Sequence, residues 1–189
     1  MAQVLKDEKR QRIIDAAIDV FYQKDYRSAT MQEIAKKANV PVGLIYSYYK
    51  NKQKLFDVIV QPVLLKLPET LKKSENTDTY EFNNFINIEK PFYTDLLKKH
   101  RQFIILIDKS AGTKHSSAKE DFKNIIEEHI KSNMINKKGV EYDDFFIHIL
   151  ASNLTESLLE IARHYKNQKW AIEMLNLVAR HFYFGNKQL

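Results

Sequence analysis

Residues 30–54 constrain the fold more than any other part of the chain, because their pattern predicts two short helices joined by a tight break. The stretch opens on TMQE, a capping box in which the threonine hydroxyl and the glutamate carboxylate each accept a hydrogen bond from the other residue's backbone. Asn39 follows the first helix and tolerates the left-handed conformation that commonly ends helices. Pro41 suits the first turn of the second helix, where no N–H is required.

The second short helix, residues 42–50, is expected to bury little of its surface. Ile45 and Tyr49 lie four residues apart and are predicted to pack with Val40 onto the preceding helices. The side chains left facing wholly or partly outward are Leu44, Tyr46, Ser47 and Tyr48, with Val42 and Gly43 at the helix start. So many exposed apolar and aromatic groups on one short helix indicate a surface for a partner.

The positive charge of the chain is concentrated beside these two helices. Residues 1–55 hold 11 Lys and Arg against 6 Asp and Glu, whereas residues 56–189 hold 19 against 18. A solvated basic face would explain a lysine-rich segment alone. Basic charge next to a groove-sized helical surface points instead to a polyanion such as DNA.

The rest of the chain predicts helices and no strands. Four Gly and four Pro among 189 residues are too few for the many turns of a sandwich or barrel. The first helix, residues 7–24, is expected to bury Ile14, Ala17, Ile18 and Phe21. Further helices are expected at residues 52–71 with a kink at Pro62, 80–99 with a break at Pro91, 100–109, 116–136, 142–165 and 169–184. The predicted fold class is all-α.

Several functional classes find no support in the sequence. The chain has no cysteine, which excludes disulfides, cysteine-based zinc sites and thiol nucleophiles. It shows no phosphate-binding glycine loop and no serine-hydrolase or zinc-protease motif, so we expect neither an enzyme nor a cofactor. The apolar run at residues 103–107 is too short to span a bilayer, and the N-terminus lacks a signal-peptide pattern. By default these features predict a cytoplasmic protein without a membrane partner.

One cluster on the penultimate helix deserves a metal-site hypothesis and its alternative. Glu156, Glu160 and His164 follow one another at intervals of four residues, so they share a helix face. The full span is long for one ion, and no paired Glu-x-x-His motif is present. A solvated or interface face is therefore the favoured interpretation, and no metal site is predicted.

Taken together, residues 7–56 resemble the N-terminal domain of the tetracycline-repressor (TetR) family of transcriptional regulators. The resemblance rests on IIDAAIDVFYQKDY at residues 13–26 and on TMQEIAKKANVPVGLIYSYYKNKQKLF at residues 30–56. The remaining two thirds agree in length and helical character. Asp25 and Asn39 stand where the family often has glycine, and both are tolerable at left-handed positions. Pro41 replaces a frequent Ser or Thr cap, and Tyr48 replaces a frequent His.

The resemblance implies a three-helix helix-turn-helix domain at residues 1–51 and an effector-binding and dimerisation domain at residues 52–189, with about nine helices in all. It implies a ligand-responsive homodimeric repressor that binds a palindromic operator in double-stranded DNA. The expected DNA contacts are Thr30, Gln32, Val42, Gly43, Leu44, Tyr46, Ser47, Tyr48, Lys50 and Lys52. Thr30, Tyr46 and Lys52 match backbone-holding positions, and the recognition helix would read mainly thymine methyl groups, since it lacks Arg and Asn.

The resemblance also implies an effector pocket and a dimer interface. An unidentified small, largely apolar effector would sit between bundled helices among Phe82, Phe85, Phe92, Tyr93, Phe103 and Phe122, although each of these taken singly is more typical of core packing. The last two helices would form a four-helix bundle with a second copy through Phe146, Leu150, Leu154, Leu158, Leu175, Ala179 and Phe182. Pairing would place two recognition helices about 34–36 Å apart, in adjacent major grooves.

Two other functional classes stay open from the residues alone. One is an architectural DNA-binding protein that receives no small-molecule signal. The other is a helical protein-interaction module that never binds DNA. An operator-binding repressor should prefer its palindrome over bulk DNA by roughly 10³-fold or more, which an architectural protein would not do. An interaction module predicts no salt-dependent DNA binding at all.

Overall fold

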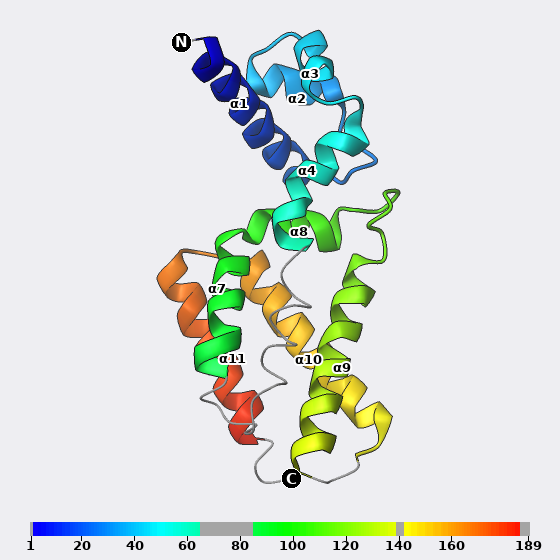
Figure 1. Ribbon diagram of the computed structural model, residues 1–189, viewed down its shortest axis with the longest axis vertical. Coiled ribbons are helices and arrows are strands. Elements are labelled where there is room, and N and C mark those ends of the chain that lie inside the picture. The colour runs from blue at the N-terminus through cyan, green and yellow to red at the C-terminus, as the bar shows by residue number, and fades with distance from the viewer. Residues whose placement is uncertain (1, 65–84, 139–141, 186–189) are drawn as a thin grey trace. The chain divides into compact units, whose positions relative to one another are not determined.

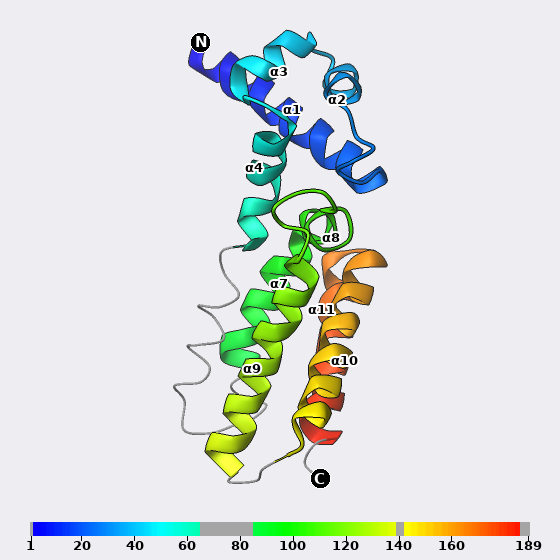
Figure 2. The same ribbon diagram turned by 90° about the vertical axis from the view of Figure 1, so that its right-hand side faces the viewer.

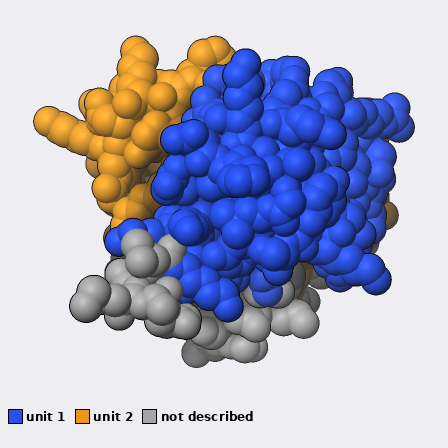
Figure 3. All heavy atoms as spheres, turned by 90° about the horizontal axis from the view of Figure 1, so that it is seen from above, with its two compact units in different colours: residues 1–64, 101–118 blue, residues 65–100, 119–189 orange. Residues whose placement is uncertain are grey.

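The computed structural model describes residues 2–64, 85–138 and 142–185. Over these ranges the chain forms nine α-helices and one π-helical segment and contains no strand. The predicted all-α fold is therefore confirmed. The chain divides into two compact units (Figure 3): unit 1 is residues 1–64 with 101–118, and unit 2 is residues 65–100 with 119–189.

Unit 1 carries the predicted helix-turn-helix (Figure 1). Its helices are α1 (Ala2–Gln23), α2 (Met31–Ala38), α3 (Val42–Tyr48), α4 (Lys52–Leu64) and most of α8 (His100–Asp108). Pro62 lies inside α4, as expected, and the predicted continuation to residue 71 lies outside the described residues. The core includes Ile13, Ala17, Phe21, Ile34, Ile45, Leu55, Phe56 and Ile105.

Helix α1 starts earlier than predicted and buries a different face. Ile13 and Val20 are buried, whereas Ile14 and Ile18 of the predicted stripe are only half-buried. The cause is that α1 packs against both α2 and α4, so the stripe must serve two neighbours. Ala17 and Phe21, which the prediction included, are completely buried.

Residues 101–118 are built into unit 1 by contacts with α1, α4 and the loop after α1. The Tyr26 amide donates to the Lys109 carbonyl at 2.9 Å, and Arg101 forms an ion pair with Asp19. Burial acts to raise the pKa of Asp19, but hydrogen bonds from Arg101 and Lys37 outweigh it and lower that pKa. The sequence placed both α4 and this segment in the second domain, and that functional boundary stays a prediction.

Unit 2 is a bundle in which α7, α9, α10 and α11 run alongside one another (Figures 1 and 2). Its described elements are the π-helical segment η1 (Phe85–Glu89), α7 (Lys90–Lys98), α9 (Ala118–Lys138), α10 (Asp144–Arg163) and α11 (Gln168–Gly185). Pro91 does not break the chain here as predicted. It occupies the first turn of α7, where its missing N–H removes no helical hydrogen bond.

By length and composition alone, α10 could cross a membrane, and no other helix in the described ranges meets that test. Its packing gives a simpler reason for its apolar character. Ala151, Leu158 and Ala162 are completely buried, and α10 packs against α11 within unit 2. This is the pattern of a core helix in a bundle.

Candidate nucleic-acid interface and effector cavity

Helix α2 is capped at both ends as predicted. The Thr30 hydroxyl accepts from the Glu33 amide at 3.2 Å, and the Glu33 carboxylate accepts from the Thr30 amide at 3.0 Å. Lys24 pairs with the same carboxylate, and this contact together with the Thr30 amide lowers the pKa of Glu33. Asn39 ends the helix at φ 52° and ψ 54°, in the left-handed region. The cap thus aims the N-terminus of α2 outward with its bonds satisfied.

Asp25 does not adopt the left-handed conformation considered for it. Among the described non-glycine residues, Asn39 is the one with positive φ. The Asp25 carboxylate instead accepts from the Ser28 amide at 2.7 Å, and this bond lowers the pKa of Asp25. The loop between α1 and α2 is therefore closed by a side chain, which glycine could not provide.

Helix α3 divides its faces as the sequence predicted. Ile45 is completely buried and Tyr49 is 5% exposed, whereas Tyr46 is 50% exposed. Gly43 is exposed, and a Cβ built on it would meet no atom within 4 Å. Pro41 lies one position earlier than predicted, as the residue before the first helical turn. The result is a short helix with an open start and one large exposed aromatic ring.

Two of the predicted base-reading residues also bond within unit 1. The Ser47 hydroxyl donates to the Leu44 carbonyl at 2.7 Å. The Tyr48 hydroxyl donates to the Lys6 carbonyl at 3.1 Å, which ties the end of α3 to the beginning of α1. Tyr48 is half-buried as a result. Nothing in the local sequence signals this bond, because its partners are 42 residues apart.

Lys52 lies over the loop between α1 and α2. Its ammonium donates to the Tyr26 carbonyl at 2.6 Å and to the Ala29 carbonyl at 2.8 Å, and it lies 4.4 Å from the centre of the Tyr26 ring. An ammonium group has three N–H donors. Any phosphate contact by Lys52 would therefore share the group with an internal structural role.

The remaining predicted contacts surround α3. Thr30, Gln32 and Lys50 are exposed, and Val42 and Leu44 are half-buried. Sequence reasoning missed Arg12, whose guanidinium donates to the Ala38 and Asn39 carbonyls at 2.7 and 3.2 Å. It thereby satisfies the C-terminal end of α2 from another helix, a long-range role that no local pattern reveals.

Asp57 joins α4 to the loop after α8 within unit 1. Its two carboxylate oxygens lie 3.0 Å from Lys114 Nζ and from His115 Nε2, and Gln53 donates to it at 2.9 Å. Partial burial acts to raise the pKa of Asp57, but these three hydrogen bonds outweigh it and lower the pKa. The sequence gave no indication of this cluster.

Unit 2 encloses a small apolar cavity with a polar cluster in its wall. Its volume is about 20 Å³, room for roughly one water molecule. The lining residues are Phe85, Glu89, Tyr93, His129, Ile130, Leu154, Leu158, Leu175, Val178, Ala179, Phe182 and Tyr183. Glu89 Oε1 accepts from the Tyr183 hydroxyl at 3.2 Å and lies 3.2 Å from His129 Nε2.

The predicted aromatic pocket is only partly assembled around this cavity. Phe85 and Tyr93 line it, with their rings stacked at 6.4 Å. Phe92 is buried against Tyr93 without being part of the lining, and Phe122 is buried in α9. Phe103 is buried in unit 1, and Phe82 lies outside the described residues. Glu89, His129 and Tyr183 were missed because they come from distant segments.

The predicted dimer residues mostly face into unit 2. Leu158, Leu175 and Ala179 are at most 3% exposed, and they line the inner cavity together with Leu154 and Phe182. Phe146 and Leu150 are half-buried. Leu158, Leu175 and Ala179 are therefore core residues of one protomer. Helical spacing could not separate the faces, because both sides of α10 and α11 carry apolar residues.

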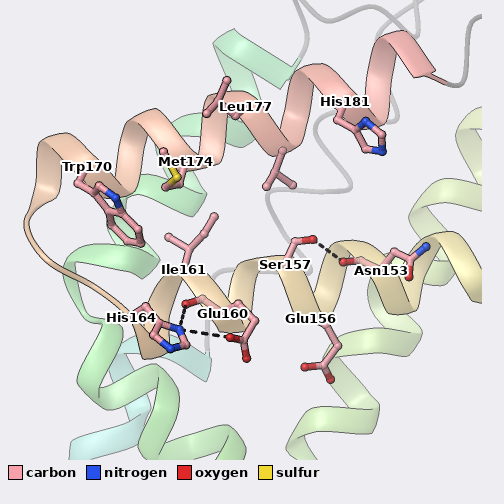
Figure 4. A pocket seen from close by; sticks show the side chains of 11 residues that line it. Asn153, Glu156, Ser157, Glu160, Ile161, His164, Trp170, Met174, Leu177 and His181 are labelled. Atoms are coloured by element: carbon pink, nitrogen blue, oxygen red, sulfur yellow. Dashed lines mark hydrogen bonds and ion pairs between the residues drawn. The ribbon is translucent and has the colours of Figure 1, made fainter.

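The outer side of α10 and α11 holds a groove of about 750 Å³ (Figure 4). Trp170, Met174 and Leu177 of α11 lie opposite Ile161 of α10, with polar residues along the α10 edge. Those polar residues include the three considered as metal ligands. Glu156 pairs with Lys119, and Arg163 and His164 pair with Glu160, so that edge is a network of ion pairs. Lys119, then Arg163, lowers the pKa of Glu156.

The first 60 residues or so match a known family of DNA-binding proteins. The family model described as "Bacterial regulatory proteins, tetR family" matches residues 13–59. The HTH-type transcriptional regulator YhgD of Bacillus subtilis is 39% identical over 62 residues, which are 33% of this chain and 32% of that protein. The chain thus aligns with about a third of the length of this relative.

Solved structures extend the likeness over nearly the whole chain. A proposed fatty acid metabolism regulator of Clostridium perfringens superimposes with a TM-score of 0.66 at 24% identity, covering 92% of this chain and 97% of the other. FadR of Bacillus subtilis, in complex with stearoyl-CoA, superimposes with a TM-score of 0.60 at 17% identity, covering 92% and 97%. At these identities the likeness establishes the fold.

Proposed function

Since the chain belongs to the tetR family of bacterial regulatory proteins, we propose that it is a homodimeric transcriptional repressor that binds a palindromic operator and is released by a small, largely apolar molecule. The observation that carries the proposal is α3. A short helix with a buried Ile45, a half-exposed Tyr46 and an unobstructed Gly43, set in the positively charged part of the chain, suits a major groove. The family is one of regulators, not of enzymes.

The proposed DNA contacts fall into two classes. Thr30, Tyr46, Lys50 and Lys52 hold phosphates, and Gln32 stands beside them at the N-terminus of α2. The bases are read by the residues along α3, namely Val42, Gly43, Leu44, Ser47 and Tyr48. Open space at Gly43 permits close approach of the backbone to a base edge. The apolar groups favour thymine methyls, and the bond from Tyr48 to α1 holds its ring in place beforehand.

A second copy is needed for specificity, because one short helix contacts only one half-site. We place the dimer on the outer side of α10 and α11. Of the large hydrophobic residues exposed within the described ranges, all except Tyr46 lie on these two helices: Phe145 at 69%, Ile149 at 40%, Leu177 at 55% and Phe184 at 46%. Exposed apolar area rimmed by ion pairs is typical of a protein interface.

The effector would bind in the cavity of unit 2. The chain passes between the units at residues 64–65, 100–101 and 118–119, so a rearrangement in unit 2 has three covalent routes to unit 1. The expected consequence is a change in the spacing of the two reading heads of the dimer. Acyl-CoA binding by FadR shows what one protein of this fold binds.

The test is selection of bound duplexes from a random DNA pool by the full-length protein. We expect enrichment of one inverted repeat whose half-sites lie about one helical turn, or a multiple of it, apart. The Tyr46→Ala variant should bind all duplexes more weakly while keeping the wild-type circular dichroism spectrum. Salt-dependent binding without a preferred sequence would support an architectural protein, and absence of DNA binding would support an interaction module.

A further inference from the structure

The cavity of unit 2 has an acidic wall, and its chemistry restricts what the proposed effector can be. Glu89 is 4% exposed, and its Oε1 is approached by the Tyr183 hydroxyl and by His129 Nε2, both at 3.2 Å. His129 and Tyr183 are themselves buried, at 6% and 8%. The two donor groups converge on one oxygen, so the cluster presents a hydrogen-bond acceptor to the cavity.

The surroundings of this acceptor are apolar. Phe85, Leu158 and Leu175 enclose it, and each is at most 3% exposed. Charge interactions are strong in such a place because water does not screen them. A ligand carrying a carboxylate or phosphate would have to bring a second negative group beside Glu89. Among the described lining residues there is no Lys or Arg to neutralise it.

We propose that this cavity binds an apolar molecule bearing a protonated amine, whose ammonium group replaces the Tyr183 hydroxyl on the Glu89 carboxylate. The inference rests on the proposed function, because it names the chemical class of the effector. The ammonium gains a charge-assisted hydrogen bond in a dry site, and His129 stays in place as the second donor. The alkyl part enlarges the small cavity by displacing half-buried Leu154 and Phe182 from its lining.

The test uses probes with one alkyl chain and different head groups: octylamine, octanoate and octanoyl-CoA. Binding to the DNA-free, full-length protein is followed by isothermal titration calorimetry at neutral pH. We expect octylamine to bind at least tenfold more tightly than either anionic probe. Equal or tighter binding of octanoate or octanoyl-CoA, or no binding of octylamine, overturns the proposal.

Two variants separate recognition from a purely structural role of the cluster. Glu89→Gln should weaken octylamine binding tenfold or more and leave octanoate binding equal or improved. Tyr183→Phe keeps the ring and removes the displaced hydroxyl, so octylamine should bind as tightly as to the wild type or more tightly. Equal losses of affinity in both variants would mean that the cluster only supports the fold. If Glu89→Gln does not fold by circular dichroism, Tyr183→Phe and the comparison of head groups decide.

Failure here and failure of the proposed function are distinguishable. A protein that selects an inverted repeat and releases it with octanoyl-CoA, but ignores octylamine, would remain a repressor with a different effector class. A protein that binds octylamine through Glu89 and selects no DNA sequence would have the acidic site without the repressor function.

Discussion

Replacing Lys52 by Met tests whether the helix-turn-helix depends on an internal ammonium. The methionine keeps an unbranched apolar stem and removes the charged group, so packing is largely preserved while the hydrogen bonds are lost. The Tyr26 and Ala29 carbonyls, which Lys52 contacts at 2.6 and 2.8 Å, then lose their donor. Both contacts are partly buried, so water replaces the donor incompletely.

The expected cost follows from these contacts. A hydrogen bond to a charged group contributes about 1.5–3 kcal/mol, and two that share one ammonium do not add fully. The position of the ammonium over the Tyr26 ring adds about 0.5–1 kcal/mol. Allowing for partial exposure, we expect Lys52→Met to lower the free energy of unfolding of unit 1 by about 2–3 kcal/mol. That is a large share of the roughly 5–15 kcal/mol typical of a domain.

The assay is urea unfolding followed by circular dichroism, with hydrogen exchange of the α2 amides as a local readout. Lys50→Met is the matched control, because Lys50 is exposed and adjacent in sequence. We expect the control to change stability by about 0.5 kcal/mol or less. If both variants unfold at the same urea concentration while only Lys52→Met lowers the salt dependence of DNA binding, Lys52 is a phosphate contact and the internal role is refuted.

Three further changes test other parts of the structure. Asp57→Asn should cost about 1–2 kcal/mol at neutral pH. Because the pKa of Asp57 is lowered in the folded state, the wild-type advantage should be complete above the unfolded pKa and shrink as pH falls below about 4, measured by urea titrations at several pH values. Leu177→Glu should yield folded monomers by light scattering, whereas Leu175→Glu, at a position 1% exposed, should disrupt unit 2 itself; a folded Leu177→Glu dimer would place the interface elsewhere. Tyr48→Phe should speed hydrogen exchange in the first turns of α1 and cost about 1 kcal/mol, and unchanged exchange would show that its bond to Lys6 contributes nothing.

Local signals predicted the helix-turn-helix well. The capping box at Thr30 and the left-handed Asn39 lie within ten residues of each other, so the chain encodes both ends of α2 through neighbours alone. The buried face of α3 followed from the spacing of Ile45 and Tyr49. These features depend on backbone preferences and helical geometry, which a sequence states directly.

Bonds between distant segments were beyond such reasoning. The Tyr183 hydroxyl reaches Glu89 across 94 residues, and Lys52 reaches the Tyr26 carbonyl across 26. Nothing near a glutamate or lysine in the sequence reveals which carbonyl or hydroxyl will lie beside it after folding. The faces of α10 and α11 failed for another reason: Leu175 and Leu177 are equally apolar, yet one is 1% exposed and the other 55%.

The return of residues 101–118 to unit 1 has a consequence for how the protein is synthesised. Phe103, Ile104, Ile105 and Leu106 of α8 are buried, and the Asp57 cluster needs Lys114 and His115. On the ribosome, the helices before residue 64 must therefore wait for some fifty further residues before their unit can close. A chimera that exchanges reading heads between relatives has to carry this second segment along with the first.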